Sequence, residues 1–203
     1  MLRDPMAVQS WGQGGTRRRL LRGVVALPWL SAMGAGAAWA ARPARIVSLG
    51  GALTEVVYLL GAQGQLVGTD TTSLFPEAAL KTAKVGYMRQ LSAEGLLSLK
   101  PDAVVGTTEA GPPVVLDQVR SAGVRVELVQ ADHTWDEVRR KVATVGRVAG
   151  REREAQALQA DLDAQWAAVQ KQVAAATQRP RAIFILSHGG SPMGAGSGAA
   201  AAA

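Results

Sequence analysis

The chain has 203 residues, 22 lysines and arginines, 16 acidic residues and a net charge of +6. Five arginines and one aspartate within residues 1–40 contribute +4 of that charge, so the rest of the chain carries only +2. This distribution argues against a nucleic-acid-binding protein, because the folded part has no strong basic excess. With no cysteine in the chain, disulfides, thiolate metal sites and cysteine nucleophiles are excluded.

Residues 1–40 have the pattern of an export leader. Three arginines at 17–19 precede an apolar stretch of 16 residues (23–38), and Ala38-Trp39-Ala40 has the small-x-small form of a cleavage site. The arginines resemble a twin-arginine signal, although the general secretory route stays open. The alternative is an uncleaved membrane anchor, for which 16 residues fall short of the ~20 that a span needs. We therefore predict a periplasmic protein cleaved near Ala40.

After the leader, short apolar strands alternate with helices. We predict strands at 45–49, 65–69, 84–86, 101–106 and 124–129, and helices at 54–60, 92–100, 112–122 and 134–149. Ser92 and Thr134 are suitable N-caps, and Gly150 ends the last of these helices. This alternation predicts an α/β lobe over residues 41–150, with a Rossmann-like parallel sheet between two layers of helices and with 124–129 as an edge strand.

A long helix is predicted next, within residues 151–179. From Arg151 to Gln178 the chain has 28 residues without glycine or proline, enough for a helix of roughly 40 Å. Such a helix suits a rigid strut between two lobes, and an ordinary surface helix is the alternative. Residues 180–203 begin with a further strand at 181–188 and end in five alanines. We expect them to be the start of a second, C-terminal lobe that is truncated or altered.

Several segments, in order and spacing, resemble one protein family: Arg45–Gly51, Thr54–Tyr58, Val67–Ser73, Val85–Arg89, Leu91–Gly95 and Lys100–Asp102. They resemble the periplasmic haem-binding proteins of bacterial haem ABC transporters, within the wider group of vitamin B12 and siderophore binders. The resemblance runs from Arg45 to about Gly198, and residues 86–95, Gly-Tyr-x-Arg-x-Leu-Ser-Ala-Glu-Gly, are its most specific part. It implies two α/β lobes joined by one backbone helix, with the ligand in the cleft between them.

The resemblance also implies roles for four residues. Tyr87 stands where a tyrosine ligates ferric haem, and Arg89 resembles the partner that hydrogen-bonds the phenolate. His188 matches a second axial ligand of some members, and Glu94 matches a glutamate that docks onto arginines of the permease. Tyrosine is an established haem ligand. Iron(III) and a nearby guanidinium both favour its anion, although a free tyrosine has a pKa of about 10.

Plainer interpretations of the same residues remain open. Tyr87 could shield a loop, Arg89 could be solvated or contact a propionate, and His188 could form a hydrogen bond at a strand end. Glu94 is favourable in the first turn of a helix whatever its function. We interpret His133 as structural. The pair of glycines at 50–51 lacks the third glycine of a dinucleotide fingerprint and the lysine of a phosphate loop.

We therefore expect a binding protein that is not an enzyme. It would capture ferric haem, as the transported ligand, in the periplasm and deliver it to an inner-membrane ABC permease, with an outer-membrane haem receptor involved only indirectly. The alternatives are a cobalamin or ferric-siderophore binder of the same fold, a Rossmann-like enzyme, and a fragment without function. The enzyme is disfavoured because the chain offers two histidines, no cysteine and no clustered carboxylates.

Overall fold

A computed structural model describes residues 43–178, 183, 185–188 and 191–194. Its centre is a sheet of four parallel strands: β1 (Ile46–Ser48), β2 (Leu66–Thr69), β3 (Ala103–Thr107) and β4 (Arg125–Val129). The strands lie in the order β2-β1-β3-β4. Every residue of β1 and β3 is buried, whereas β4 lies at the edge and is partly exposed. The predicted parallel sheet and its edge strand are thus confirmed.

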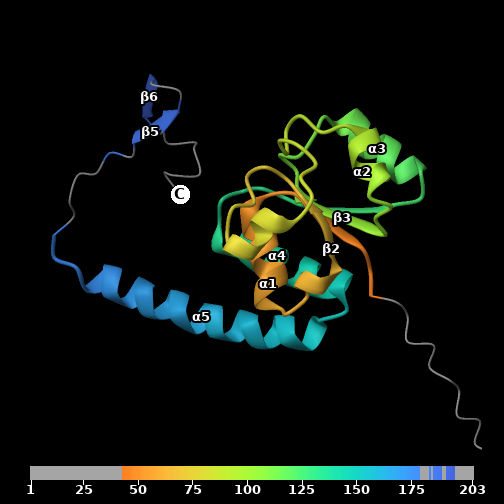
Figure 1. Cartoon of the computed structure of the whole chain (residues 1–203). Helices are drawn as coiled ribbons and strands as arrows, with labels where there is room; N and C mark the ends of the chain where they lie inside the picture. Colours follow the sequence, from red (N-terminus) through yellow and green to blue (C-terminus); the bar gives the residue numbers. More distant parts are fainter. Residues whose placement is uncertain (1–42, 179–182, 184, 189–190, 195–203) are drawn as a thin grey trace, which may run out of the picture. The chain divides into compact units, whose positions relative to one another are not determined.

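Helices cover both faces of this sheet, as predicted. On one face, α1 (Gly51–Leu59) and α4 (Trp135–Ala149) pack against β1 and β3 through a core that includes Leu53, Val57, Val105, Val142 and Val145. On the other face, α2 (Ala93–Ser98) and α3 (Pro113–Ser121) enclose a second core that includes Val47, Leu96, Val104, Leu116 and Val119. The two helical layers are visible on opposite sides of the strands in Figure 1. Two short 3-10 helices, η1 (Gln63–Gln65) and η2 (Glu77–Lys81), complete the lobe.

Local signals in the sequence placed most helix ends correctly. The Ser92 hydroxyl accepts the Gly95 N–H at 3.0 Å, and the Thr134 hydroxyl accepts the Glu137 N–H at 3.3 Å. α4 stops at Gly150, which has a left-handed backbone. The strand predicted at 84–86, in contrast, does not form: its only pairing is an isolated bridge between Lys84 and Thr69.

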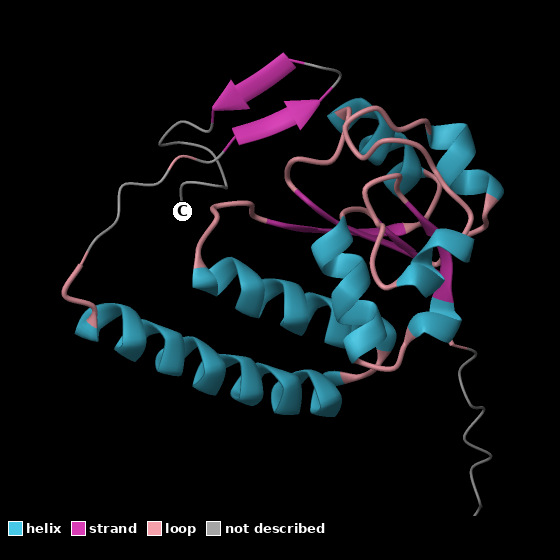
Figure 2. Ribbon diagram, turned by 60° about the vertical axis from the view of Figure 1, so that its left-hand side comes forward, coloured by secondary structure: helices cyan, strands magenta, loops and turns pink. Residues whose placement is uncertain are grey.

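The long helix is confirmed as α5 (Glu152–Ala175), whose 24 residues span about 36 Å. Its first half packs antiparallel against α4, and the two helices lie side by side in Figure 2. Trp135 of α4 and Trp166 of α5 stack with their ring centroids 4.8 Å apart, and the Trp135 indole N–H donates to Asp163 at 2.6 Å. Residues 164–178 are exposed. A role as a strut between lobes stays a prediction.

Beyond α5 the structure describes a two-stranded antiparallel hairpin of β5 (Ile185–His188) and β6 (Ser191–Gly194). β5 falls within the strand predicted at 181–188. The side chains of both strands and the residues after 194 lie outside the described part of the chain. The predicted boundaries of the leader, the strut and a C-terminal lobe therefore stay predictions.

The crossing of α4 and α5 depends on a glycine. A Cβ atom added at Gly146 would lie 2.5 Å from the Cβ of Ala155 and 3.3 Å from the carbonyl oxygen of Arg151. Neither atom belongs to a flexible side chain, so the helices would have to move apart.

We expect Gly146→Ala to lower the free energy of unfolding by about 1–3 kcal/mol, the usual cost of overpacking. The change should be destabilising even though alanine is favoured over glycine in a helix by about 1 kcal/mol. Denaturant unfolding of the chain measures it. The double variant Gly146→Ala with Ala155→Gly should recover most of the loss, and an unrescued loss would contradict the close-contact explanation.

Candidate functional site

Tyr87 lies on the loop that leads from β2 to α2. Gly86 precedes it with a φ of +97°, a conformation that L-residues with a side chain rarely adopt. The Gly86 carbonyl accepts the Thr71 N–H at 2.9 Å, and the Tyr87 carbonyl accepts the Gln90 N–H at 2.8 Å. The backbone is therefore fixed on both sides of the tyrosine, while its side chain is 41% exposed. The phenol is held at the surface of the lobe rather than in its core.

A buried carboxylate supports the neighbouring loop. Asp70 is fully buried, and its side chain accepts the N–H groups of Gly50 at 2.9 Å and Thr72 at 3.0 Å. It also accepts the hydroxyl groups of Ser73, at 2.6 Å, and Thr72. The Asp70 carboxylate thus joins the loop after β2 to the start of α1.

Lys84 closes the same loop from the other side. Its ammonium donates to the Thr69 hydroxyl at 2.8 Å and to the carbonyl oxygens of Ser73 at 3.0 Å and Ala79 at 3.1 Å. The Lys84 side chain thus links the end of β2, the loop that follows it and η2. This linked segment, residues 69–84, leads directly into the turn that carries Tyr87.

Arg89 forms an ion pair that the sequence did not indicate. Its guanidinium donates to the Glu109 carboxylate at 2.6 Å, and both side chains are at least 40% exposed. The partner predicted for it, the phenolate of Tyr87, is not the acceptor in this geometry, so that role stays a prediction. The Gly111 N–H donates to the Met88 carbonyl at 2.9 Å. The Tyr87 turn and the loop after β3 are thus joined by backbone and side chain.

A pocket of about 230 Å³, here called the switch-point pocket, opens beside this turn. It lies past the carboxyl ends of β1 and β3, the neighbouring strands at which the strand order reverses. In open α/β sheets this position is where ligands bind. The pocket is lined by Leu49, Gly50, Gly51, Ala52, Leu53, Thr72, Met88, Thr107, Glu109, His133, Glu137 and Lys141.

One wall of the switch-point pocket carries a buried ion pair. Lys141 and Glu137 lie 2.6 Å apart, and their side chains are 17% and 6% exposed. Burial alone would raise the pKa of Glu137, but hydrogen bonds from Lys141 and from the backbone N–H groups of His133 and Asp132 outweigh it, so the pKa lies below its usual value. Glu137 is therefore ionised near neutral pH. His133, which we interpreted as structural, donates its backbone N–H here and also lines the pocket.

The other predicted site residues are placed as follows. Glu94 is exposed in the first turn of α2, where a docking residue would have to be accessible. His188 belongs to β5, and its side chain lies outside the described part of the chain. No signal in the sequence indicated Thr107, Glu109 or Lys141. Their positions, at the end of β3, just after it and on α4, indicate a site only once the order of the strands is known.

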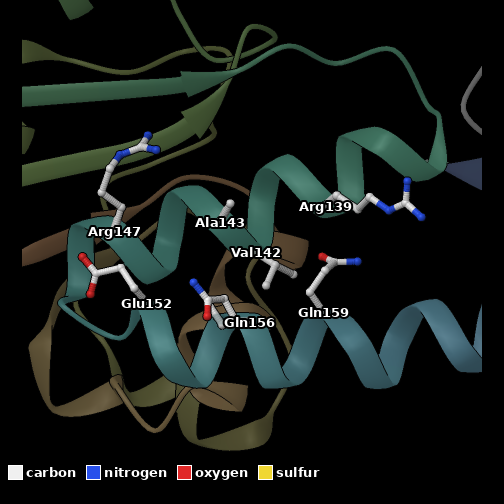
Figure 3. Close-up of a pocket in the computed structure, with 8 residues that line it drawn as sticks. Arg139, Val142, Ala143, Arg147, Glu152, Gln156 and Gln159 are labelled. Atoms are coloured by element: carbon white, nitrogen blue, oxygen red, sulfur yellow. The ribbon is translucent and has the colours of Figure 1, made fainter.

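A second hollow, of about 370 Å³, lies between α4 and α5 (Figure 3). Its arginines already have partners: Arg139 pairs with Asp136 and Asp163, and Arg147 pairs with Glu127. The hollow lies on elements that do not carry Tyr87, and we assign it no role in binding.

Two kinds of feature are absent from the described residues. No group of three or more histidine, aspartate or glutamate side chains there is arranged to hold a metal ion. No helix in the same part of the chain has the length and apolar character needed to cross a membrane.

Comparison with known proteins identifies the family. The model of the periplasmic binding protein family matches residues 46–202. Among solved structures, the periplasmic haem-binding protein BhuT in complex with two haems is 41% identical, with a TM-score of 0.72 over 78% of this chain and 62% of that one.

Two curated relatives add to this comparison. The ABC transporter substrate-binding lipoprotein YvrC of Bacillus subtilis is 32% identical over 57% of this chain. The vitamin B12-binding protein of Pectobacterium carotovorum is 30% identical over 60% of it. The chain spans 37% and 45% of the length of these two relatives. BhuT and both curated relatives are named as binding proteins rather than as enzymes, in agreement with the expectation from the sequence.

The parallel sheet with helices on both faces agrees with the likeness of the fold to BhuT. The family match covers the whole of the described lobe and continues past α5. The chain belongs to the periplasmic binding protein family.

Proposed function

We propose that this chain binds ferric haem through Tyr87 and delivers it to an inner-membrane ABC permease. The observation that carries the proposal is the fixed, half-exposed phenol beside the switch-point pocket. Its hydroxyl has no hydrogen-bond partner among the described residues, so iron would not have to displace one. Tyrosinate is an established ligand of haem iron.

The relatives support haem more strongly than the corrinoid alternative. BhuT, which holds haem, is 41% identical to this chain, whereas the Pectobacterium vitamin B12-binding protein is 30% identical. The second candidate ligand, vitamin B12, stays in consideration because of that relative. The two ligands place different demands on Tyr87, since only ferric haem needs its oxygen as a metal ligand.

Titration of the chain with ferric hemin and, separately, with cyanocobalamin tests this choice. We expect hemin to give a saturating change in the Soret region with a spectrum of tyrosinate-ligated ferric haem. Cyanocobalamin should neither bind in equilibrium dialysis nor displace hemin. Binding of cyanocobalamin without any saturable hemin spectrum would reverse the assignment.

Arg89 is proposed as the partner of the Tyr87 phenolate, acting when haem is bound. Its present pair with Glu109 lies at the surface, where such pairs contribute about 0–1 kcal/mol. A guanidinium carries five N–H donors, so Arg89 can donate to the phenolate two residues away while it stays paired with Glu109. His188 is proposed as a second iron ligand from the C-terminal part of the protein.

The site of action follows from the leader and from the family. We propose export to the periplasm with cleavage near Ala40, and sequencing of the exported protein from its N-terminus tests it. Delivery would use Glu94, whose carboxylate stands exposed on α2 and could meet arginines of the permease.

We expect Glu94→Ala to leave hemin affinity unchanged and to lower permease-dependent haem uptake by cells about fivefold or more, the effect of losing one interface residue worth over 1 kcal/mol. Glu77→Ala is the matched control, since Glu77 is an exposed glutamate in the first turn of η2. Equal uptake by the two variants would remove Glu94 from the docking surface.

A further inference from the structure

The switch-point pocket is too small for a tetrapyrrole ring. Its volume is about 230 Å³, whereas pockets that enclose a drug-sized ligand measure roughly 300–1,000 Å³. Met88 forms part of its wall and directly follows Tyr87, so the pocket begins within one residue, about 3.8 Å along the chain, of the proposed iron ligand. A ligand bound at Tyr87 could place a substituent in the pocket, but not its whole body.

One residue that lines this pocket carries an unpaired hydroxyl. Thr107 is 7% exposed, and its Oγ1 is buried with no hydrogen-bond partner in the described part of the protein. Side chains alternate along a strand, so Thr107 shares a face of β3 with Ala103 and Val105, which belong to the core under α1 and α4. The hydroxyl therefore points to the side from which Leu53, Glu137 and Lys141 line the pocket. A buried polar group without a partner is costly, so this one calls for an explanation.

The start of α1 supplies further donors. Gly50 gives its N–H to Asp70, but the N–H groups of Gly51, Ala52 and Leu53 find no acceptor among the described residues. All three residues line the pocket. Free N–H groups at a helix N-terminus favour a negatively charged oxygen. Together with the Thr107 hydroxyl, they are unpaired donors of two elements, α1 and β3, whose residues line one pocket.

The charged groups around the pocket leave room for one more anion. Four titratable side chains line it: Glu109, His133, Glu137 and Lys141. Each carboxylate already has its own cation at 2.6 Å, Glu109 with Arg89 and Glu137 with Lys141. An ammonium group carries three donors, so Lys141 retains donors beyond the one facing Glu137. The unpaired Thr107 hydroxyl, the free N–H groups of α1 and the Lys141 ammonium are all hydrogen-bond donors, which suits a carboxylate better than a cation.

We propose that the switch-point pocket binds a carboxylate substituent of the ligand held at Tyr87, through the Thr107 hydroxyl, the first N–H groups of α1 and Lys141. The proposal rests on the proposed haem function, in which the carboxylate is one of the two propionates of haem. It makes Thr107 and Lys141 determinants of specificity, because a tetrapyrrole with esterified side chains would leave these buried donors unpaired.

The test compares hemin with hemin dimethyl ester, which keeps the ring and the iron and lacks both charges. Each is titrated, in the same solvent mixture, into the wild-type chain and into Thr107→Val. We expect the wild type to bind hemin about tenfold more tightly than the ester, a difference of about 1.4 kcal/mol. Thr107→Val should lose most of that preference while its affinity for the ester is unchanged.

A stability measurement separates loss of a ligand contact from damage to the fold. Valine has nearly the shape of threonine and suits a strand, so removing an unpaired buried hydroxyl should leave the melting temperature of Thr107→Val equal or higher. Thr144→Val, on α4 outside the pocket, is the matched control and should bind both ligands as the wild type does. Lys141→Met should also lower the preference for hemin, and Lys171→Met on exposed α5 should not.

Three outcomes would overturn the proposal. In the first, Thr107→Val keeps the full preference for hemin over the ester. In the second, Thr107→Val lowers the affinity for hemin and for the ester by the same factor. The third outcome combines two results: acetate raises the melting temperature of the wild type but not that of Thr107→Val, and hemin and its ester bind the wild type equally well. The pocket would then bind a free anion from solution and not a substituent of the ligand. If the wild type gives no tyrosinate-ligated spectrum at all, it is the haem function itself that fails.

Discussion

Tyr87→Phe is expected to abolish the tyrosinate-ligated spectrum of ferric haem and to weaken hemin binding by more than 100-fold. Mutating partners outside the ligand sphere of a metal typically costs 10–100-fold in affinity, and this substitution removes a ligand itself. Phenylalanine keeps the ring, so contacts of the ring with a porphyrin would survive and only the oxygen would be lost. The measurement is a Soret titration of wild type and variant with hemin.

The only other tyrosine of the chain provides the control. Tyr58 lies on α1, half-buried against the hollow that Leu59 and Phe75 also line. Tyr58→Phe should retain the wild-type spectrum and affinity. A Tyr87→Phe protein with an unchanged ferric spectrum would show that iron is held by another residue, and the proposed function would have to be built around that residue.

Asp70→Ala is expected to lower the free energy of unfolding by about 3 kcal/mol or more. The fully buried carboxylate accepts from two backbone N–H groups and two hydroxyl groups. Hydrogen bonds to a charged group contribute about 1.5–3 kcal/mol each and are not additive, and the stranded donors would also lose their acceptor. Urea denaturation measures the change.

Asp117→Ala is the matched control for this substitution. Asp117 is exposed on α3 and pairs with Arg120 at the surface, so its loss should change stability by less than about 0.5 kcal/mol. Because Asp70 also fixes the Gly50 N–H at the start of α1, Asp70→Ala should weaken hemin binding even under conditions where the variant is folded. A variant as stable as the wild type would mean that solvent replaces the carboxylate, contrary to its complete burial.

The sequence predicted the fold well because its signals are local. A serine three residues before Gly95, a glycine at 150 and alternating apolar runs each act within one or two turns of chain, and each has the predicted effect. The strand predicted at 84–86 is wrong for a reason of the same kind, since the positive φ of Gly86 turns the chain away from extended backbone. Apolar residues alone could not reveal that turn.

The candidate site was predictable only in part. Tyr87 and Glu94 were indicated by a motif that is contiguous in sequence, and the structure describes both as exposed. The pairing of Arg89 with Glu109, 20 residues away, depends on the position of β3 beside β1. Thr107, at the end of β3, is recognised as a candidate only when the structure shows that its buried hydroxyl has no hydrogen-bond partner among the described residues. Such relations arise from the order of strands, which no short segment encodes.

The residues of the switch-point pocket stand at strand ends, in loops or in the first two turns of helices, and apart from Leu49, Leu53 and Met88 they lie outside the two apolar cores. The residues that would bind a ligand and the residues that stabilise the fold are therefore largely different. Substitutions at Glu109 or His133, which belong to neither core, would change the lining of the pocket and leave both cores untouched. The haem-binding and vitamin B12-binding names among its relatives agree with a scaffold whose ligand can change while its cores are kept.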